Sequence, residues 1–168
     1  MTLNFSGGQI VTTNINQGRE WRNGTTRAVM LNLPSPAPRV SDITGVTITT
    51  NFRSGLSGDN WNVDKVALVV SFPAGSTTTG PTPPVVHDWL IPPSASSLPL
   101  IPLPLIRFTG DIHDLTLPVS VPPDDLGRPV TDLKLIISTG NDDLRGGSNP
   151  GDNCNVTVQL TSGQSFSA

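Results

Sequence analysis

The chain has 168 residues, a formal net charge of −3, and charged residues at only 14% of its positions. Its 10 lysines and arginines are scattered, and because no basic stripe exists to neutralise phosphates, nucleic acid is not expected as a partner. The length predicts a single domain over residues 1–168, and 17 prolines and 16 glycines predict many turns within it.

Short runs in which apolar and polar residues alternate predict strands that bury one face. No long segment repeats apolar residues at helical spacing, so helices are not expected. Gly7 and Gly8 interrupt the first run as the turn of a hairpin would. The pattern predicts an all-β fold, a two-sheet antiparallel β-sandwich. In chain order, the predicted strand segments cover residues 2–15, 27–33, 43–52, 65–72, 105–110, 114–121, 132–139 and 154–162.

Two of these segments carry a more specific expectation. In residues 43–52 the alternation places Val46 and Ile48 on one face. Residues 65–72 read KVALVVSF, a nearly continuous apolar run, so both faces of this strand are expected to be covered.

Residues 73–106 have prolines too dense for central strands and are predicted to form a long proline-rich loop. Residues 85–91 within it, VVHDWLI, fit a short edge strand. The loop either covers a sheet edge or a sandwich end, or it presents an apolar interface to another copy or a protein partner. The candidate interface residues in it are Leu100, Ile101 and Leu103.

A Gly-Asp motif occurs three times, each time shortly before a predicted strand. The copies are GDNWN at 58–62, GDIHD at 110–114 and GDNCN at 151–155. Glycine permits positive φ, and Asp or Asn side chains bond back to nearby backbone N–H groups, so the motif suits a turn that leads into a strand. The other interpretation is a calcium loop, because calcium binds carboxylate, amide and backbone oxygens.

Calcium is predicted mainly at the loop over residues 140–155, which is rich in oxygen ligands and lacks the spacing of an EF-hand. The candidate metal ligands there are Asp142, Asp143, Asp152 and Asn153. Asp59 and Asn60 belong to a poorer second set.

The two ends of the chain resemble each other. When the first predicted strand is aligned with the last one, Leu3 and Phe5 match alternating apolar residues of the last strand, among them Val158. Either alternating strands simply look alike, or the first strand replaces the last strand of a neighbouring copy. The second interpretation predicts a self-assembling filament or shell subunit, with Leu3, Phe5 and Val158 at the interface.

The tryptophans allow a sugar-binding interpretation. Trp61 lies beside Asn62 in the first full Gly-Asp motif, and an exposed tryptophan among polar side chains is how sugar sites are often built. The alternative is that Trp61 is buried and caps the sandwich core. Trp21 lies between arginines in GREWR, which fits a turn.

Enzyme motifs are missing from the sequence. It contains no nucleophile elbow, phosphate-binding loop, HExxH motif or CxxC pair, and its one cysteine, Cys154, is expected to be a small apolar residue. The chain is therefore predicted to be non-catalytic.

The first ten residues lack a charged segment and a long apolar core, so they are not expected to be a signal peptide. Residues 98–106 are too short and too rich in proline to cross a bilayer. The chain is then either cytoplasmic, or exported by a route that the sequence does not show, or trimmed. Neutral polar surfaces with few lysines are common in secreted β-proteins, and this correlation favours the extracellular interpretation.

Residues 133–163, LKLIISTGNDDLRGGSNPGDNCNVTVQLTSG, resemble part of the PLAT/LH2 modules, the β-sandwiches attached to lipases and lipoxygenases. Residues 46–68 resemble a similar segment in secreted bacterial accessory domains. The resemblance implies a sandwich that places a partner on a lipid or protein surface, often with calcium in its loops. By this resemblance, the loop residues that would supply oxygen ligands to calcium are Asp142, Asp143, Asp152 and Asn153. Residues 73–106 have no counterpart, and the order of segments fits a permuted unit.

Together these observations predict a non-catalytic calcium-loop module that binds or assists a partner in an extracellular protein. The alternatives are the self-assembling subunit and a carbohydrate-binding module. The expected partners are a protein or other copies of the chain, with a glycan or lipid surface as a further candidate.

Overall fold

The computed structural model describes residues 3–5, 8–52, 59–72, 85–91, 105–119, 127–147 and 152–161. Strands dominate these ranges, and a short 3-10 turn, η1 (Val40–Asp42), precedes the fourth strand. Within the same ranges, no helix is long and apolar enough to cross a membrane. The strands are β1 (Leu3–Phe5), β2 (Gln9–Thr12), β3 (Thr26–Leu31), β4 (Ile43–Thr50), β5 (Trp61–Phe72), β6 (Val85–Ile91), β7 (Ile106–Phe108), β8 (Asp114–Pro118), β9 (Asp132–Thr139) and β10 (Cys154–Leu160).

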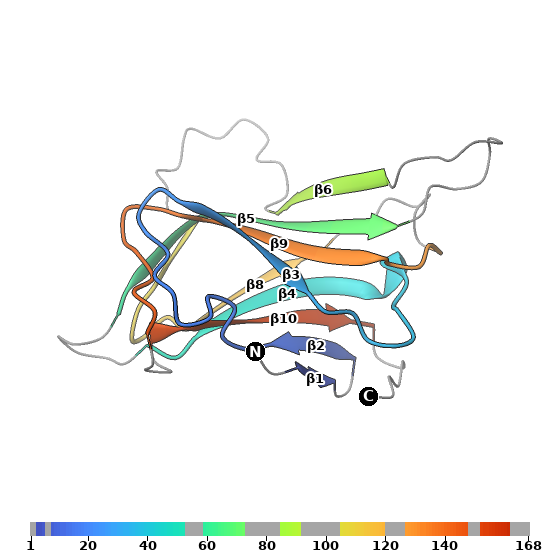
Figure 1. The fold of residues 1–168 in the computed structure, drawn as a ribbon, viewed down its shortest axis with the longest axis horizontal. Helices are drawn as coiled ribbons and strands as arrows, with labels where there is room; N and C mark the ends of the chain where they lie inside the picture. Colours follow the sequence, from blue (N-terminus) through green and yellow to red (C-terminus); the bar gives the residue numbers. More distant parts are fainter. Residues whose placement is uncertain are drawn as a thin grey trace.

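The strands form two antiparallel sheets that enclose one core, so the predicted all-β two-sheet sandwich is confirmed (Figure 1). The first sheet has the order β1-β2-β10-β4-β8. The second has the order β3-β9-β5-β6, and β7 pairs with the start of β5.

Alternation explains why these strands bury one face. Along β9 and β10 every second side chain is buried, as a period of two requires. Ile137 of the second sheet and Val156 of the first belong to the same hydrophobic cluster. The predicted shared face of Val46 and Ile48 is confirmed, because both lie in this cluster.

Strand β5 is covered on both faces, as its apolar run predicted. Val66, Leu68 and Val70 belong to the core cluster, whereas Ala67 and Val69 alternate with them and are also buried. Strand β5 therefore lies inside the second sheet with apolar side chains buried on both of its faces.

The N-terminal hairpin is confirmed, because β1 pairs with β2 within the chain. Strand β10 lies between β2 and β4 and is hydrogen-bonded on both sides. Its residue Val158 is fully buried in the core. The prediction that Val158 is an interface residue was therefore wrong, because the side chain is already packed inside its own sandwich. The role of Leu3 and Phe5 at an interface stays a prediction.

Within the proline-rich region, the short edge strand predicted at 85–91 is present as β6, which ends the order of the second sheet. Most of the remaining segment, including the candidate interface residues Leu100, Ile101 and Leu103, lies outside the described residues.

Candidate ligand pocket at one end of the sandwich

Four connections carry the chain from one sheet to the other at the same end of the sandwich. They join β2 to β3, β4 to β5, β7 to β8 and β9 to β10. In Figure 1 they gather on the left. We call this the crossing end.

The three Gly-Asp motifs all belong to connections at the crossing end. The two fuller copies are paired in space, since β4 lies beside β10 and β5 beside β9. The backbone N–H of Asn62 donates to the Asp142 carbonyl at 3.0 Å, and that of Gly140 donates to the Asn62 carbonyl at 2.8 Å. In the residues that the structure describes, the two connections that carry the fuller copies therefore contact each other.

Asp59, a predicted calcium ligand, is held by protein donors. Its side chain is only 2% exposed and accepts hydrogen bonds from the backbone N–H groups of Asn60 at 3.0 Å and Arg145 at 2.9 Å. The Nε atom of Arg145 also lies 3.2 Å from the carboxylate. The arginine thus supplies the positive charge that a bound cation would supply.

Burial raises the pKa of Asp59 above its ordinary value, because desolvation disfavours the charged carboxylate. The backbone hydrogen bond and charge of Arg145, and the Asn60 hydrogen bond, oppose that shift, whereas the charge of Asp152 adds to it. Asp59 and Asp152 come from different motifs, so the fold brings their charges within electrostatic range.

This raised pKa predicts a specific dependence of stability on pH. The ordinary pKa of this carboxyl is 3.8, so as the pH rises past that value the unfolded chain loses the Asp59 proton before the folded chain does. The contribution of Asp59 to the free energy of unfolding therefore falls as the pH rises. The unfolding free energy of the wild type minus that of Asp59→Asn is expected to decrease across this window and then level off. Urea titrations between pH 3.5 and 7 measure it.

The exposed carboxylate of Asp132 offers a control for general charge effects. Measuring the same difference for Asp132→Asn separates the effect of removing any one negative charge from the effect of the buried Asp59 site. A difference for Asp59→Asn that rises with pH would contradict the assigned direction.

Two of the other predicted metal ligands, Asp142 and Asn153, also have protein partners. The Asp142 carboxylate is 2.8 Å from Nη2 of Arg107, and Oδ1 of Asn153 accepts from Nδ2 of Asn16 at 2.8 Å. Asp143 is partly buried. Among the described residues, no three His, Cys, Asp or Glu side chains converge as a metal site. Calcium binding at this end stays a prediction.

Trp61 lies in the core, which corrects the sugar-site interpretation. Its side chain is 0% exposed, its ring stacks on Phe108 with centroids 5.5 Å apart, and its Nε1–H donates to Oγ1 of Thr139 at 3.1 Å. Asn62 is buried as well, and its Oδ1 has no hydrogen-bond partner within the described structure. A sugar cannot stack on a ring that has no exposed face, so Trp61 is structural.

Cys154 is buried at the start of β10, and burial raises the pKa of its thiol. Because the thiolate is the reactive form, this environment suppresses nucleophilic chemistry. The residue packs in the core cluster, in keeping with its predicted apolar role.

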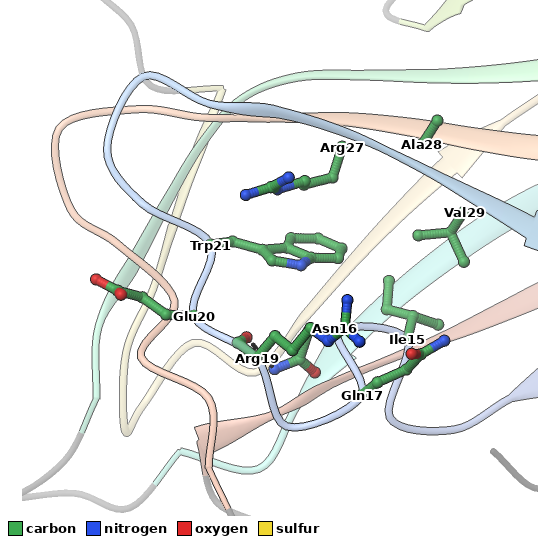
Figure 2. Close-up of a pocket in the computed structure, with 9 residues that line it drawn as sticks. All are labelled: Ile15, Asn16, Gln17, Arg19, Glu20, Trp21, Arg27, Ala28 and Val29. Carbon is green, nitrogen blue, oxygen red and sulfur yellow. Dashed lines mark hydrogen bonds between the residues drawn. The ribbon is translucent and has the colours of Figure 1, made fainter.

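A pocket of about 290 Å³ opens beside the connection from β2 to β3 (Figure 2). Trp21 forms one wall and is otherwise buried, with its ring edge-on to Trp61 at 5.7 Å. The complete lining is Ile15, Asn16, Gln17, Arg19, Glu20, Trp21, Arg27, Ala28 and Val29.

Backbone pairing holds the pocket in shape. Trp21 and Leu144 exchange two hydrogen bonds, at 2.8 and 3.1 Å, and form an isolated bridge between the first and last crossing connections. The N–H of Gly147 donates to the Gly18 carbonyl at 2.8 Å. Nδ2 of Asn16 donates to the Arg19 carbonyl at 3.1 Å. The walls therefore exist before any ligand arrives.

The mouth of the pocket is cationic. Arg19 and Arg27 are exposed, and within the described ranges no carboxylate pairs with either of them. Glu20 also lines the pocket, but Arg22 lies 3.1 Å from it and offsets its charge. Figure 2 shows the side chains of Arg27 and Trp21 extending into the same space.

The sequence around Trp21 predicted a turn, but the pocket beside it was not predicted. The sequence feature that could have indicated the pocket is the GREWR segment at 18–22, in which an aromatic residue is flanked by charged residues. The residues across from it, 27–29, belong to a strand whose sheet partner lies more than 100 positions away along the chain, which local patterns do not specify.

In comparisons with known proteins, no family model, curated protein or solved structure matches this chain. The resemblance to PLAT/LH2 modules therefore stays a prediction, and what the chain does has to be argued from its own residues.

Proposed function

We propose that this protein is a non-catalytic β-sandwich binding module that holds an anionic group of its partner in the crossing-end pocket. The observation that carries the proposal is the pairing of an aromatic wall, Trp21, with two arginines that lack acidic partners in the described structure. We place the module in an extracellular protein as part of the same proposal.

The chemistry of the lining favours a carboxylate attached to an apolar stem. Arginine presents a planar fork of N–H donors that matches a carboxylate. Ile15, Val29 and the Trp21 ring offer an apolar wall for the carbon atoms that carry it. A volume of about 290 Å³ is at the small end for a ligand site, so one side chain or a small acid fits better than a large cofactor.

Three small molecules with the same branched stem test the proposal: 3-methylbutanoate, 3-methylbutanol and 3-methylbutylamine. In titrations followed by amide chemical shifts, the acid is expected to shift residues 15–21 and 27–29 with a Kd on the order of 1–10 mM. The alcohol should bind more weakly and the amine more weakly still, because the mouth is cationic.

Arg27→Ala should remove the preference for the acid over the alcohol. Lys65→Ala removes an exposed lysine of β5 that does not line the pocket, and it should leave the titration unchanged. Shifts scattered over the whole surface, or no shifts for any of the three molecules, would contradict the proposal.

A further inference from the structure

The geometry points to the free edge of β3 as a docking site for an extended peptide, which joins the second sheet as an additional strand and places an acidic side chain in the pocket. This inference rests on the proposed function, since it uses the same pocket. It adds the class of partner, a peptide segment in strand conformation, and the backbone groups that recognise it.

The direction of the β3 backbone follows from one hydrogen bond. The N–H of Thr139 donates to the Thr25 carbonyl at 2.8 Å. The backbone N–H and C=O groups of residue 25 therefore point toward β9. In an antiparallel pair these directions alternate along the strand. The N–H and C=O groups of Thr26, Ala28 and Met30 therefore point to the open edge, and in the described part of the chain β3 has β9 as its only partner strand.

The pocket opens on this edge and not on a sheet face. Arg27, Ala28 and Val29 are consecutive, and all three line it. Successive side chains of a strand point to opposite faces, so a pocket on one face would contact every second residue. Contact with three in a row places the cavity along the strand's edge, where an added strand would run.

One edge strand of the first sheet, β8, is protected against such pairing. At β8 the N–H of Thr50 donates to the His113 carbonyl at 2.7 Å, so by the same alternation Asp114, Thr116 and Pro118 face the open side. A proline without an N–H and a charged residue at such positions discourage pairing with another strand. Strand β3 carries neither proline nor charge at its outward backbone positions.

The positive charge of the arginines at the pocket mouth favours a peptide with an acidic side chain. An added strand beside β3 directs alternate side chains toward Arg27 and Val29, which both line the pocket. With Arg19 also at the mouth, the side chain that enters is acidic, and its apolar neighbours pack on Trp21 and Ile15. Backbone hydrogen bonds supply affinity and the pocket supplies specificity, as in other strand additions.

The probe is the blocked heptapeptide acetyl-Thr-Val-Thr-Glu-Thr-Val-Thr-amide, with matched peptides that carry Gln or Lys at the centre. Amide shifts and fluorescence anisotropy measure binding to the intact chain. The Glu peptide is expected to bind about tenfold more tightly than the Gln peptide, because a charge-assisted bond to arginine is the stronger one. The Lys peptide should bind more weakly than either.

Two proline variants separate strand addition from occupation of the pocket alone. Met30→Pro removes an outward N–H that β9 does not use, at a position that does not line the pocket, and it is expected to weaken binding of the Glu peptide by about tenfold or more. Binding of 3-methylbutanoate should persist. Thr116→Pro makes the same change on the open side of β8, and it should leave peptide affinity within about twofold.

A version of the Glu peptide methylated on alternate backbone nitrogens provides the same test on the wild-type chain, so the inference stays testable if Met30→Pro does not fold. Equal affinity of the methylated and unmethylated peptides, or of the Glu and Gln peptides, would overturn the inference. If 3-methylbutanoate binds and no peptide does, the proposed function stands and only strand addition fails. If neither binds, both fail.

Discussion

Replacing Trp61 by alanine is expected to lower the free energy of unfolding by about 3–5 kcal/mol, a large part of the 5–15 kcal/mol that holds a typical domain folded. The side chain is among the largest that are fully buried, and it packs against both Phe108 and Trp21. Its removal leaves a cavity and deprives Thr139 of the Nε1–H donor. Urea unfolding followed by circular dichroism measures the loss.

Trp61→Phe is the matched control. It keeps an aromatic ring over Phe108 and loses the indole N–H, so its cost should be clearly smaller than that of alanine. A loss below about 1 kcal/mol for Trp61→Ala would mean that the residue is not the centre of the aromatic cluster.

The second large effect is expected at the backbone contact beneath the pocket. Gly146 has φ +68°, and a Cβ added there would meet the carbonyl of Arg19. Gly146→Ala therefore combines the cost of a left-handed alanine, about 1–2 kcal/mol, with a collision against backbone that cannot rotate away. We expect a total of about 3 kcal/mol or more and a displaced pocket wall.

Gly24→Ala isolates the conformational part of that cost. Gly24 has φ +67°, nearly the same value, but nothing lies within 4 Å of an added Cβ. Its loss should be about 1 kcal/mol, and binding of 3-methylbutanoate should be unaffected. Chemical denaturation measures the loss of unfolding free energy in both variants. Equal losses would show that the contact between Gly146 and Arg19 does not contribute to the cost of Gly146→Ala.

Local alternation was sufficient to predict most of the strands and the sandwich. In β9 and β10 a period of two determines which side chains are buried, and the burial of β5 on both faces followed from its apolar run. These properties depend on residues that are neighbours in the chain.

The arrangement of the crossing end could not be predicted in the same way. The residues beside Trp61 left both an exposed and a buried side chain open, and in the structure it is the first residue of β5 and faces the core. Asp59 meets Arg145, 86 positions later, because the β4–β5 and β9–β10 connections converge. Turn chemistry specifies each connection but not the partner that it meets.

The position of β10 has a consequence for the order in which the chain can fold. This last strand fills the space between β2 and β4, with Val156 opposite Thr12 and Ile48. Strands β2 and β4 are synthesised before β10. The edge of each strand that pairs with β10 therefore lacks this partner until residues 154–160 have left the ribosome. The long sequence separation of these contacts predicts slow, late closure of the first sheet, after which the sandwich forms as one unit.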